Sequence, residues 1–224
     1  MNLRKTLVTG LIASSLSLGG GVALAQEGTP EESPAASPPV SPATIATVER
    51  FPLSTPDGVV IAYVDITQNS TAGDVTFLIE STDESTLEPG LHGIHIHEVG
   101  ACDASGDTPY ESAGGHFNPG EHMHGAPDDD ESHAGDLGNI EVADDGSFSY
   151  EVTTDKVTLI ETQENTLADA DGSALIIHAG EDDLETDPSG ESGDRVACGI
   201  IFPSVEPAMN ATPPSASPDA TPEN

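Results

Sequence analysis

A pair of histidines separated by one residue stands in an alternating segment at 93–98, where His95 and His97 flank a single isoleucine. A β-strand repeats every two residues, so the two imidazoles are predicted to share one face of a strand. Imidazoles placed side by side suit a borderline metal such as copper or zinc. A His-x-His pair alone is weak evidence for a metal site, so further ligands are needed to interpret it.

The segment that follows supplies such ligands. His116, His124, His133 and Asp136 occur at successive spacings of eight, nine and three residues. Three imidazoles and one carboxylate form a donor set that a tetrahedral zinc ion accepts. Frequent glycines and prolines between them would let the backbone fold tightly around an ion. The alternative is a polar surface loop in which these histidines occur by chance.

Two further residues are ambiguous when taken singly. His178 ends the apolar segment 174–177, and a lone histidine at a strand end is more often a satisfied structural residue. Arg195 lies near Cys198 and is one of few basic residues, which makes it a candidate contact for an anion. Its alternative role is an ordinary ion pair with one of the many carboxylates.

Short segments rich in β-branched residues surround these candidates and are predicted to be strands. They are 59–67, 74–81, 93–98, 139–142, 147–153, 157–161, 174–178 and 196–202, with a hairpin turn at Asp144-Asp145-Gly146. Helical periodicity is absent, so we expect an all-β sandwich or barrel of about eight strands over 44–203. The connections 99–138 and 179–195 are too long for simple hairpins and are expected to be functional loops.

Both ends of the chain differ from this domain. Residues 1–25 are typical of an export signal, with Arg4 and Lys5 before a mostly apolar stretch and Ala23-Leu24-Ala25 as the cleavage site. An uncleaved membrane anchor is the alternative. Residues 26–43 and 204–224 are rich in Pro, Ser and Ala and are predicted to be disordered linkers. We therefore expect a secreted protein, either extracellular or held in the cell envelope or periplasm, with no membrane contact after cleavage.

Charge and cysteine content limit the classes of partner and indicate how the cysteines pair. The chain carries 40 acidic and 5 basic residues, and cleavage after Ala25 would leave 3 basic residues and a net charge of −37. Nucleic acids and anionic membranes are therefore poor partners. Cys102 and Cys198 are the two cysteines, and in an oxidising compartment they are expected to pair, two free thiols being the alternative.

Several motifs together resemble the copper/zinc superoxide dismutase family. They are Gly93–Glu98, His116–Pro119, His124–Pro127, His133–Asn139 and Gly193–Gly199. The resemblance spans about 44–203. It implies an eight-stranded antiparallel Greek-key β-barrel or sandwich, with one copper and one zinc per subunit, that converts superoxide to dioxygen and hydrogen peroxide by copper redox cycling. Whether the protein is a monomer or a homodimer stays open.

The resemblance also assigns roles to individual residues. It implies that copper is bound by His95, His97, His116 and His178, and zinc by His116, His124, His133 and Asp136. His116 would be shared by both metals and would carry a catalytic proton. Asp182 would link a copper histidine to a zinc histidine, and Arg195 would guide the anionic substrate. Cys102–Cys198 would be the family disulfide, and His92 a structural histidine on the core-facing side of its strand.

The sequence also departs from the family pattern. Ala101 and Glu191 replace residues that the signatures usually prefer, and 179–195 contains seven acidic residues and no lysine, so fast electrostatic steering of superoxide is in doubt. A second interpretation is an extracellular copper- or zinc-binding protein without dismutase activity, which His122 and Met123 favour slightly. A third is a structural or adhesive β-domain, which leaves the ligand set unexplained.

Overall fold

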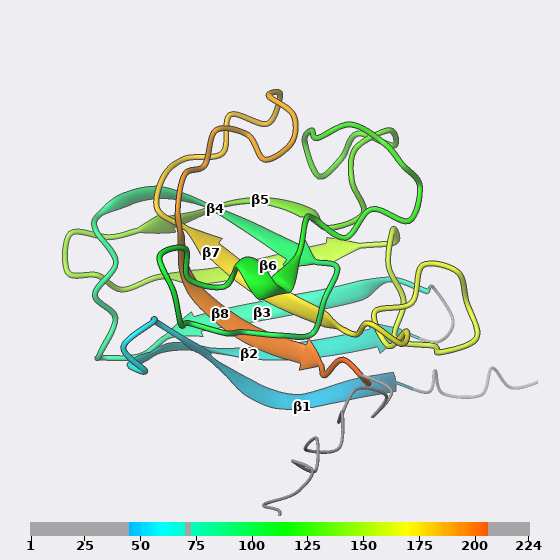
Figure 1. Cartoon of the computed structure of the whole chain (residues 1–224), viewed down its shortest axis with the longest axis horizontal. Coiled ribbons are helices and arrows are strands. Elements are labelled where there is room, and N and C mark those ends of the chain that lie inside the picture. The colour runs from blue at the N-terminus through cyan, green and yellow to red at the C-terminus, as the bar shows by residue number, and fades with distance from the viewer. Residues whose placement is uncertain (1–44, 70–72, 206–224) are drawn as a thin grey trace, which may run out of the picture. The chain divides into compact units, whose positions relative to one another are not determined.

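A computed structural model describes residues 45–69 and 73–205, and within them all eight strands belong to one antiparallel sheet (Figure 1). The strands are β1 (Ile45–Ser54), β2 (Val60–Asn69), β3 (Val75–Ser81), β4 (Gly90–His97), β5 (Asp136–Val142), β6 (Ser149–Thr154), β7 (Ser173–His178) and β8 (Arg195–Phe202). A single 3₁₀ turn, η1 (Glu111–Ala113), lies between β4 and β5. The predicted export signal and both predicted linkers, apart from residues 204 and 205, lie outside the described residues. No described helix is long and apolar enough to cross a membrane.

The sheet curls into a nearly closed barrel with Greek-key connections. Its strand order is β5-β4-β7-β8-β1-β2-β3-β6, so β5 and β6 are consecutive in the chain but stand at opposite edges of the sheet. Across the seam between these edges, the Tyr150 hydroxyl on β6 donates a 2.6 Å hydrogen bond to the Leu137 carbonyl on β5. The expected eight-stranded antiparallel Greek-key barrel is confirmed.

The barrel interior is a single large apolar core. Alternate residues of β2 and β3 are buried, among them Ile66, Phe77 and Ile79, each fully excluded from solvent. The strands β4 and β7 differ, since both faces of each are covered and the six residues from His92 to His97 are all buried. One face of these two strands packs in the core, which leaves the other available to a buried polar site beneath the loops.

The structure differs from the sequence prediction in three details. Residues 157–161 do not form a strand; instead the buried Gln68 side chain bonds to the Thr158 hydroxyl and the Leu159 amide, replacing the ladder that a strand would need. Strand β1 was not predicted, because a register shift between Val48 and Phe51 breaks its two-residue alternation. The turn at 144–146 exists, but the strands that it joins are the two sheet edges rather than a paired hairpin.

The two long loops project from the same side of the barrel in Figure 1, one drawn in green and the other in orange. They contact each other directly, since the His124 amide donates a 2.9 Å hydrogen bond to the Asp187 carboxylate. The start of the first loop is tied to β8 by the disulfide Cys102–Cys198, which confirms the predicted pairing. Crosslinking residues 96 apart in the sequence restricts the unfolded chain and is worth about 4–5 kcal/mol in the chain-entropy view.

The seam hydrogen bond gives a testable prediction for stability. Tyr150→Phe leaves the Leu137 carbonyl without its donor in a half-buried place, so we expect the free energy of unfolding to fall by about 1–2 kcal/mol. Urea denaturation of the metal-loaded protein measures it. Tyr63→Phe, at an exposed ring on β2, is the matched control and should cost less than about 0.5 kcal/mol. Equal losses in both variants would contradict the role of the seam.

Candidate metal centre

Four histidines from three parts of the chain meet beside the barrel wall. His95 and His97 project from β4, and β7, which pairs with β4, brings His178 to its end. His116, in the first long loop, pairs with His97 through an isolated β-bridge. All four side chains are buried, and one ring nitrogen from each lies within 4.8 Å of those of the others.

These four rings share an unusual property. Among the described residues, five buried side-chain nitrogen or oxygen atoms lack a hydrogen-bond partner, and four of them are ring nitrogens of these histidines: Nδ1 of His95 and Nε2 of His97, His116 and His178. A buried polar atom without a partner costs about 1–3 kcal/mol. Four of them converging on one point therefore fit a metal ion that accepts four lone pairs.

The opposite edge of each ring is fixed by the protein. His97 and His178 donate from Nδ1 to the carbonyls of Gly114 and Gly193, each over 3.0 Å. A ring nitrogen that donates its proton leaves the other nitrogen with a free lone pair, so these contacts select the tautomer that can bind a metal. His95 is reversed: its Nε2 contacts Asp182, and its Nδ1 points into the cluster.

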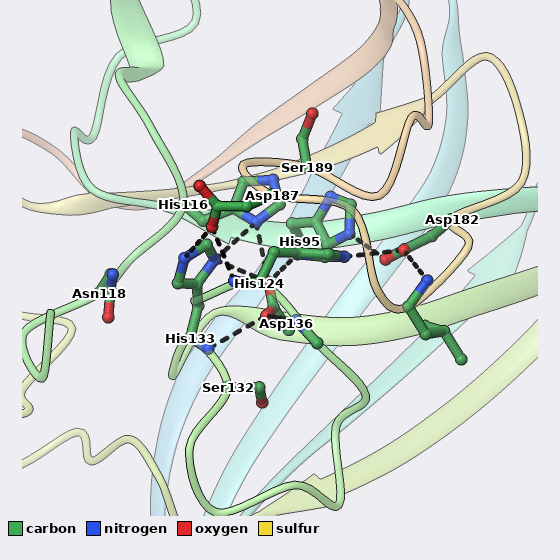
Figure 2. A network of polar contacts seen from close by, with 12 residues as sticks. His95, His116, Asn118, His124, Ser132, His133, Asp136, Asp182, Asp187 and Ser189 are labelled. Atoms are coloured by element: carbon green, nitrogen blue, oxygen red, sulfur yellow. Dashed lines mark hydrogen bonds and ion pairs between the residues drawn. The ribbon is translucent and has the colours of Figure 1, made fainter. Parts of the chain in front are cut away.

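A second set of donors converges on one carboxylate oxygen (Figure 2). Oδ1 of Asp136 lies 2.8 Å from Nδ1 of His116, 3.1 Å from Nδ1 of His124 and 3.2 Å from Nδ1 of His133. Its other oxygen accepts hydrogen bonds from the amides of Gly125 and His133, which fixes the carboxylate. Three imidazoles and one carboxylate facing one point fit a four-coordinate zinc ion.

The two donor sets are joined at two places. The His116 ring belongs to both, with Nδ1 toward Asp136 and Nε2 toward the four-histidine set. Asp182 also links the two donor sets: its carboxylate lies 2.7 Å from Nε2 of His95 and 2.8 Å from Nε2 of His124. The ligand atoms of His95 and His124 also approach each other within 4.8 Å, but His95 belongs to the first set, because its Nε2 is taken by Asp182 and its Nδ1 has no partner.

Two residues that sequence reasoning did not single out position this bridge. The Asn139 side chain on β5 donates to the Asp182 carbonyl and accepts from its amide, over 2.9 and 2.8 Å. Gly190 passes so close that a β-carbon there would overlap the Asp182 carboxylate and crowd the His124 ring, and its φ of 63° also favours glycine. Asn139 lay within a quoted motif; Gly190 had no signal of its own, since its closeness depends on the folded loop.

Arg195 lies at the rim of the four-histidine set. Its two terminal nitrogens each donate over 2.6 Å, Nη1 to the Tyr110 carbonyl and Nη2 to the Gly114 carbonyl. It shares the Gly114 carbonyl with Nδ1 of His97, and its charge adds to desolvation in lowering the pKa of His97 and His178. No described carboxylate forms an ion pair with it, so the ordinary pairing considered from the sequence is not seen.

His92 is not part of either donor set. Its ring is buried, with Nδ1 2.8 Å from the His178 carbonyl and Nε2 2.8 Å from the Glu88 carbonyl. It therefore fixes the end of β7 that carries His178, as expected for a structural histidine.

Burial sets the protonation of the metal-free cluster. Desolvation lowers the pKa of His116 to about 4 and of His178 to about 3, and it lowers those of His95 and His97 too. Burial alone would also lower the pKa of His124, but hydrogen bonds to Asp136 and Asp182 raise it to about 10. The four-histidine set is therefore neutral near pH 7, the form that binds metals.

These shifts predict how the metal-free protein responds to acid. Below pH 6.5 the unfolded chain protonates its histidines, whereas folded His116 stays neutral down to about pH 4, so stability falls as the pH falls through this window. His124 opposes this fall only weakly, because below pH 6.5 it is increasingly protonated in the unfolded state as well as in the folded state. We expect His116 alone to cost about 1–2 kcal/mol between pH 6.5 and 5.

Thermal unfolding of metal-free protein across this range tests the prediction. A His116→Gln variant should lose less Tm as the pH falls, since it lacks one histidine whose pKa is lower in the folded state than in the unfolded state. A Tm that stays constant from pH 6.5 to 5 would contradict it.

Known proteins resemble this chain in sequence and in fold. Superoxide dismutase (Cu-Zn) 1 of Aquifex aeolicus (strain VF5) is 41% identical over 120 residues, which are 53% of this chain and 69% of that protein. The crystal structure of a SOD-like protein from Bacillus subtilis has a TM-score of 0.60 at 35% identity and covers 70% of this chain and 99% of that one. A double mutant of the same protein, with a tyrosine and a proline replaced by histidine, has a TM-score of 0.62 at 36% identity, with the same coverage.

The match to a protein family covers most of the barrel and both donor sets. Residues 60–201 match the family described as copper/zinc superoxide dismutase (SODC). This range contains β2 to β7, β8 except its last residue, every histidine described above, Asp136, Asp182 and the disulfide. The chain belongs to the copper/zinc superoxide dismutase family.

Proposed function

We propose that this protein is a superoxide dismutase that converts superoxide to dioxygen and hydrogen peroxide, with copper in the four-histidine set and zinc bridged to it through His116. The observation that carries the proposal is the convergence of four buried ring nitrogens without partners, one of them on a ring whose other nitrogen faces Asp136. A structural β-domain would have no reason to bear the cost of these unsatisfied atoms.

The residues of the site have separate roles in the proposed reaction. Copper bound there would supply the one-electron exchange by which one superoxide is oxidised to dioxygen and another is reduced to hydrogen peroxide. His95, His97 and His178 would hold the ion, with ring orientations fixed by Asp182 and two backbone carbonyls. Nε2 of His116 is placed to take up and release a proton for the peroxide product, while Nδ1 remains held by the Asp136 side of the site.

Arg195 is proposed to orient the anionic substrate. A guanidinium has five N–H donors, and two terminal nitrogens here bond to backbone carbonyls that also position the first loop and η1. These bonds hold the positive charge in place beside His97 and His178, and the remaining donors are available to an anion. Charge-assisted hydrogen bonds of this kind are the stronger class.

The rival interpretation, a copper or zinc buffer, rests on His122 and Met123. Met123 is 65% exposed, and the Nδ1 of His122 lies 3.1 Å from the Ser132 carbonyl, so neither belongs to the two donor sets. A buffer needs no positioned arginine, whereas Arg195 is fixed by two hydrogen bonds at the rim. The described residues therefore favour the enzyme.

We propose export as the setting of this activity. The disulfide Cys102–Cys198 is formed, and stable disulfides are typical of oxidising compartments outside the cytosol. Together with the predicted signal at 1–25, it supports a secreted protein, whether extracellular or in the cell envelope.

The first experiment combines activity with metal content. We expect purified mature protein to disproportionate superoxide with about one copper and one zinc per chain, counted on the same sample. His178→Ala should lose at least 100-fold in activity together with most of its copper, while zinc is retained, because His178 belongs only to the four-histidine set. His122→Ala is the matched control and should change neither quantity. A fully metallated but inactive wild type would favour the buffer instead.

A second prediction concerns salt. Seven acidic residues occupy the loop 179–195, and each basic residue in the described part of the chain is held by oxygen acceptors, Arg50 and Lys156 included. The long-range field should therefore repel superoxide, and salt screens such a field, with a Debye length of about 30 Å at 0.01 M and about 8 Å at 0.15 M. We expect kcat/KM to rise or stay flat between these salt concentrations.

Pulse radiolysis or a competitive assay at several salt concentrations measures this dependence. A steep fall in kcat/KM would show instead that the local positive charge of Arg195 and the metal dominates the approach of the substrate.

A further inference from the structure

Lys156, two residues after the end of β6, reaches from the barrel to the part of the first long loop that lies between the predicted zinc ligands His124 and His133. Its Nζ donates to the Ser132 hydroxyl over 2.7 Å and also to the Asp129 carbonyl. Both acceptors lie between His124 and His133, in the short segment that joins these two ligands. The lysine therefore ties this segment to a strand that contributes no ligand of its own.

Ser132 lies at the centre of this connection. It is 3% exposed, and its hydroxyl lies 2.8 Å from the Ala126 carbonyl on the other side of the loop. Its β-carbon would be 3.1 Å from a β-carbon placed on Gly125, so the two sides of the loop are in close contact next to His124 and His133. A hydroxyl has one proton to donate and lone pairs to accept, so Ser132 can donate across the loop while it accepts from Lys156.

The segment that Lys156 contacts is strongly acidic. Residues 128–131 are four consecutive acidic residues, all exposed, and they repel one another within a single turn of chain. Among the described residues there are three lysines and arginines, and the other two are engaged elsewhere: Arg50 with Asp65 and Glu80, and Arg195 with carbonyls at the rim of the four-histidine set. Lys156 is the third, and although it forms no ion pair with these carboxylates, its bond to the Asp129 carbonyl places its charge beside them.

We propose that Lys156 is a positioning residue for zinc. By closing the segment 125–132, Lys156 keeps the Nδ1 atoms of His124 and His133 facing Asp136. This inference rests on the proposed zinc site. A zinc ion is lost when one of its ligands swings away, and repulsion between the four adjacent negative charges would favour a more open segment. By holding Asp129 and Ser132, Lys156 should slow that opening, so its effect should appear in the rate at which zinc leaves.

The test compares Lys156→Met, which keeps the length of the side chain but removes its charge and donors, with wild type. Zinc release from loaded protein to a coloured chelator is followed at low salt. We expect Lys156→Met to release zinc at least 10-fold faster, in line with the 10–100-fold effects known for residues that support metal ligands. Lys156→Arg should restore most of the retention. Arg50→Met, which removes a cation at the distant β1–β3 surface, is the matched control and should release zinc at the wild-type rate.

Two further measurements separate positioning from a general loss of stability. The visible spectrum of cobalt bound in place of zinc should weaken or shift in Lys156→Met, because it reports ligand geometry at that site. Ser132→Ala keeps the lysine charge but removes one of its acceptors, so it should speed zinc release by itself. In the double variant with Lys156→Met, the fold-increase in the release rate should be smaller than the product of the two single fold-increases.

Zinc release at the wild-type rate in Lys156→Met, with an unchanged cobalt spectrum, would overturn the inference and leave the proposed dismutase intact. Equal acceleration by Lys156→Met and Arg50→Met would also overturn it, because the effect would then be one of general destabilisation. Failure of the wild-type protein to bind zinc or cobalt at all would instead overturn the proposed function itself.

Discussion

Six histidine and two aspartate side chains are packed between the barrel wall and two loops, where they are largely shielded from water. Each buried polar atom must find a partner or bear a cost comparable to a lost hydrogen bond. The protein supplies partners for most of their ring nitrogens and carboxylate oxygens, through backbone carbonyls, backbone amides and two shared carboxylates. The few nitrogens that it leaves free all face one point, and the surrounding structure serves to keep them there.

The loops that enclose this cluster have almost no regular structure, so individual contacts determine their shape. The first loop is tied to β8 by the disulfide and to β4 by Glu98, whose carboxylate accepts the Gly115 amide next to His116. The second is held by the paired hydrogen bonds between Asn139 and Asp182, and it passes the cluster at Gly190. The barrel provides the rigid frame, and these few contacts transmit its rigidity to the ligands.

Much of the fold was predictable from the sequence because it depends on local pattern, and spacing suggested the zinc donors, whereas the roles of His178, Asp182 and Arg195 came from the resemblance to the family. Alternation in β2, β3 and β4 identified strands, and the combination of His95, His97 and the later motifs predicted residues that the structure does bring together. The strand β1 was missed because a bulge breaks its pattern, and 157–161 was misjudged because the Gln68 side chain, distant in sequence, satisfies its backbone.

The contacts that position the site were the least predictable. Gly190 and Lys156 act through neighbours that are far away in the sequence, and only the folded loops show which carboxylate or carbonyl each one meets. Neither has a spacing that distinguishes it from an ordinary loop glycine or surface lysine. Such residues are identified by proximity, which a single sequence does not contain.

The sharing of His116 and Asp182 between the two donor sets has a thermodynamic consequence. An ion that occupies either set orders a ring and a carboxylate that the other set also needs, so part of the entropic cost of ordering the second set has already been met. The two affinities would therefore be coupled, and coupling of this kind is reciprocal: whatever factor one metal contributes to the retention of the other, it receives in return. Two ions held in this way would behave as one cooperative unit, so removing either one would weaken the binding of the other.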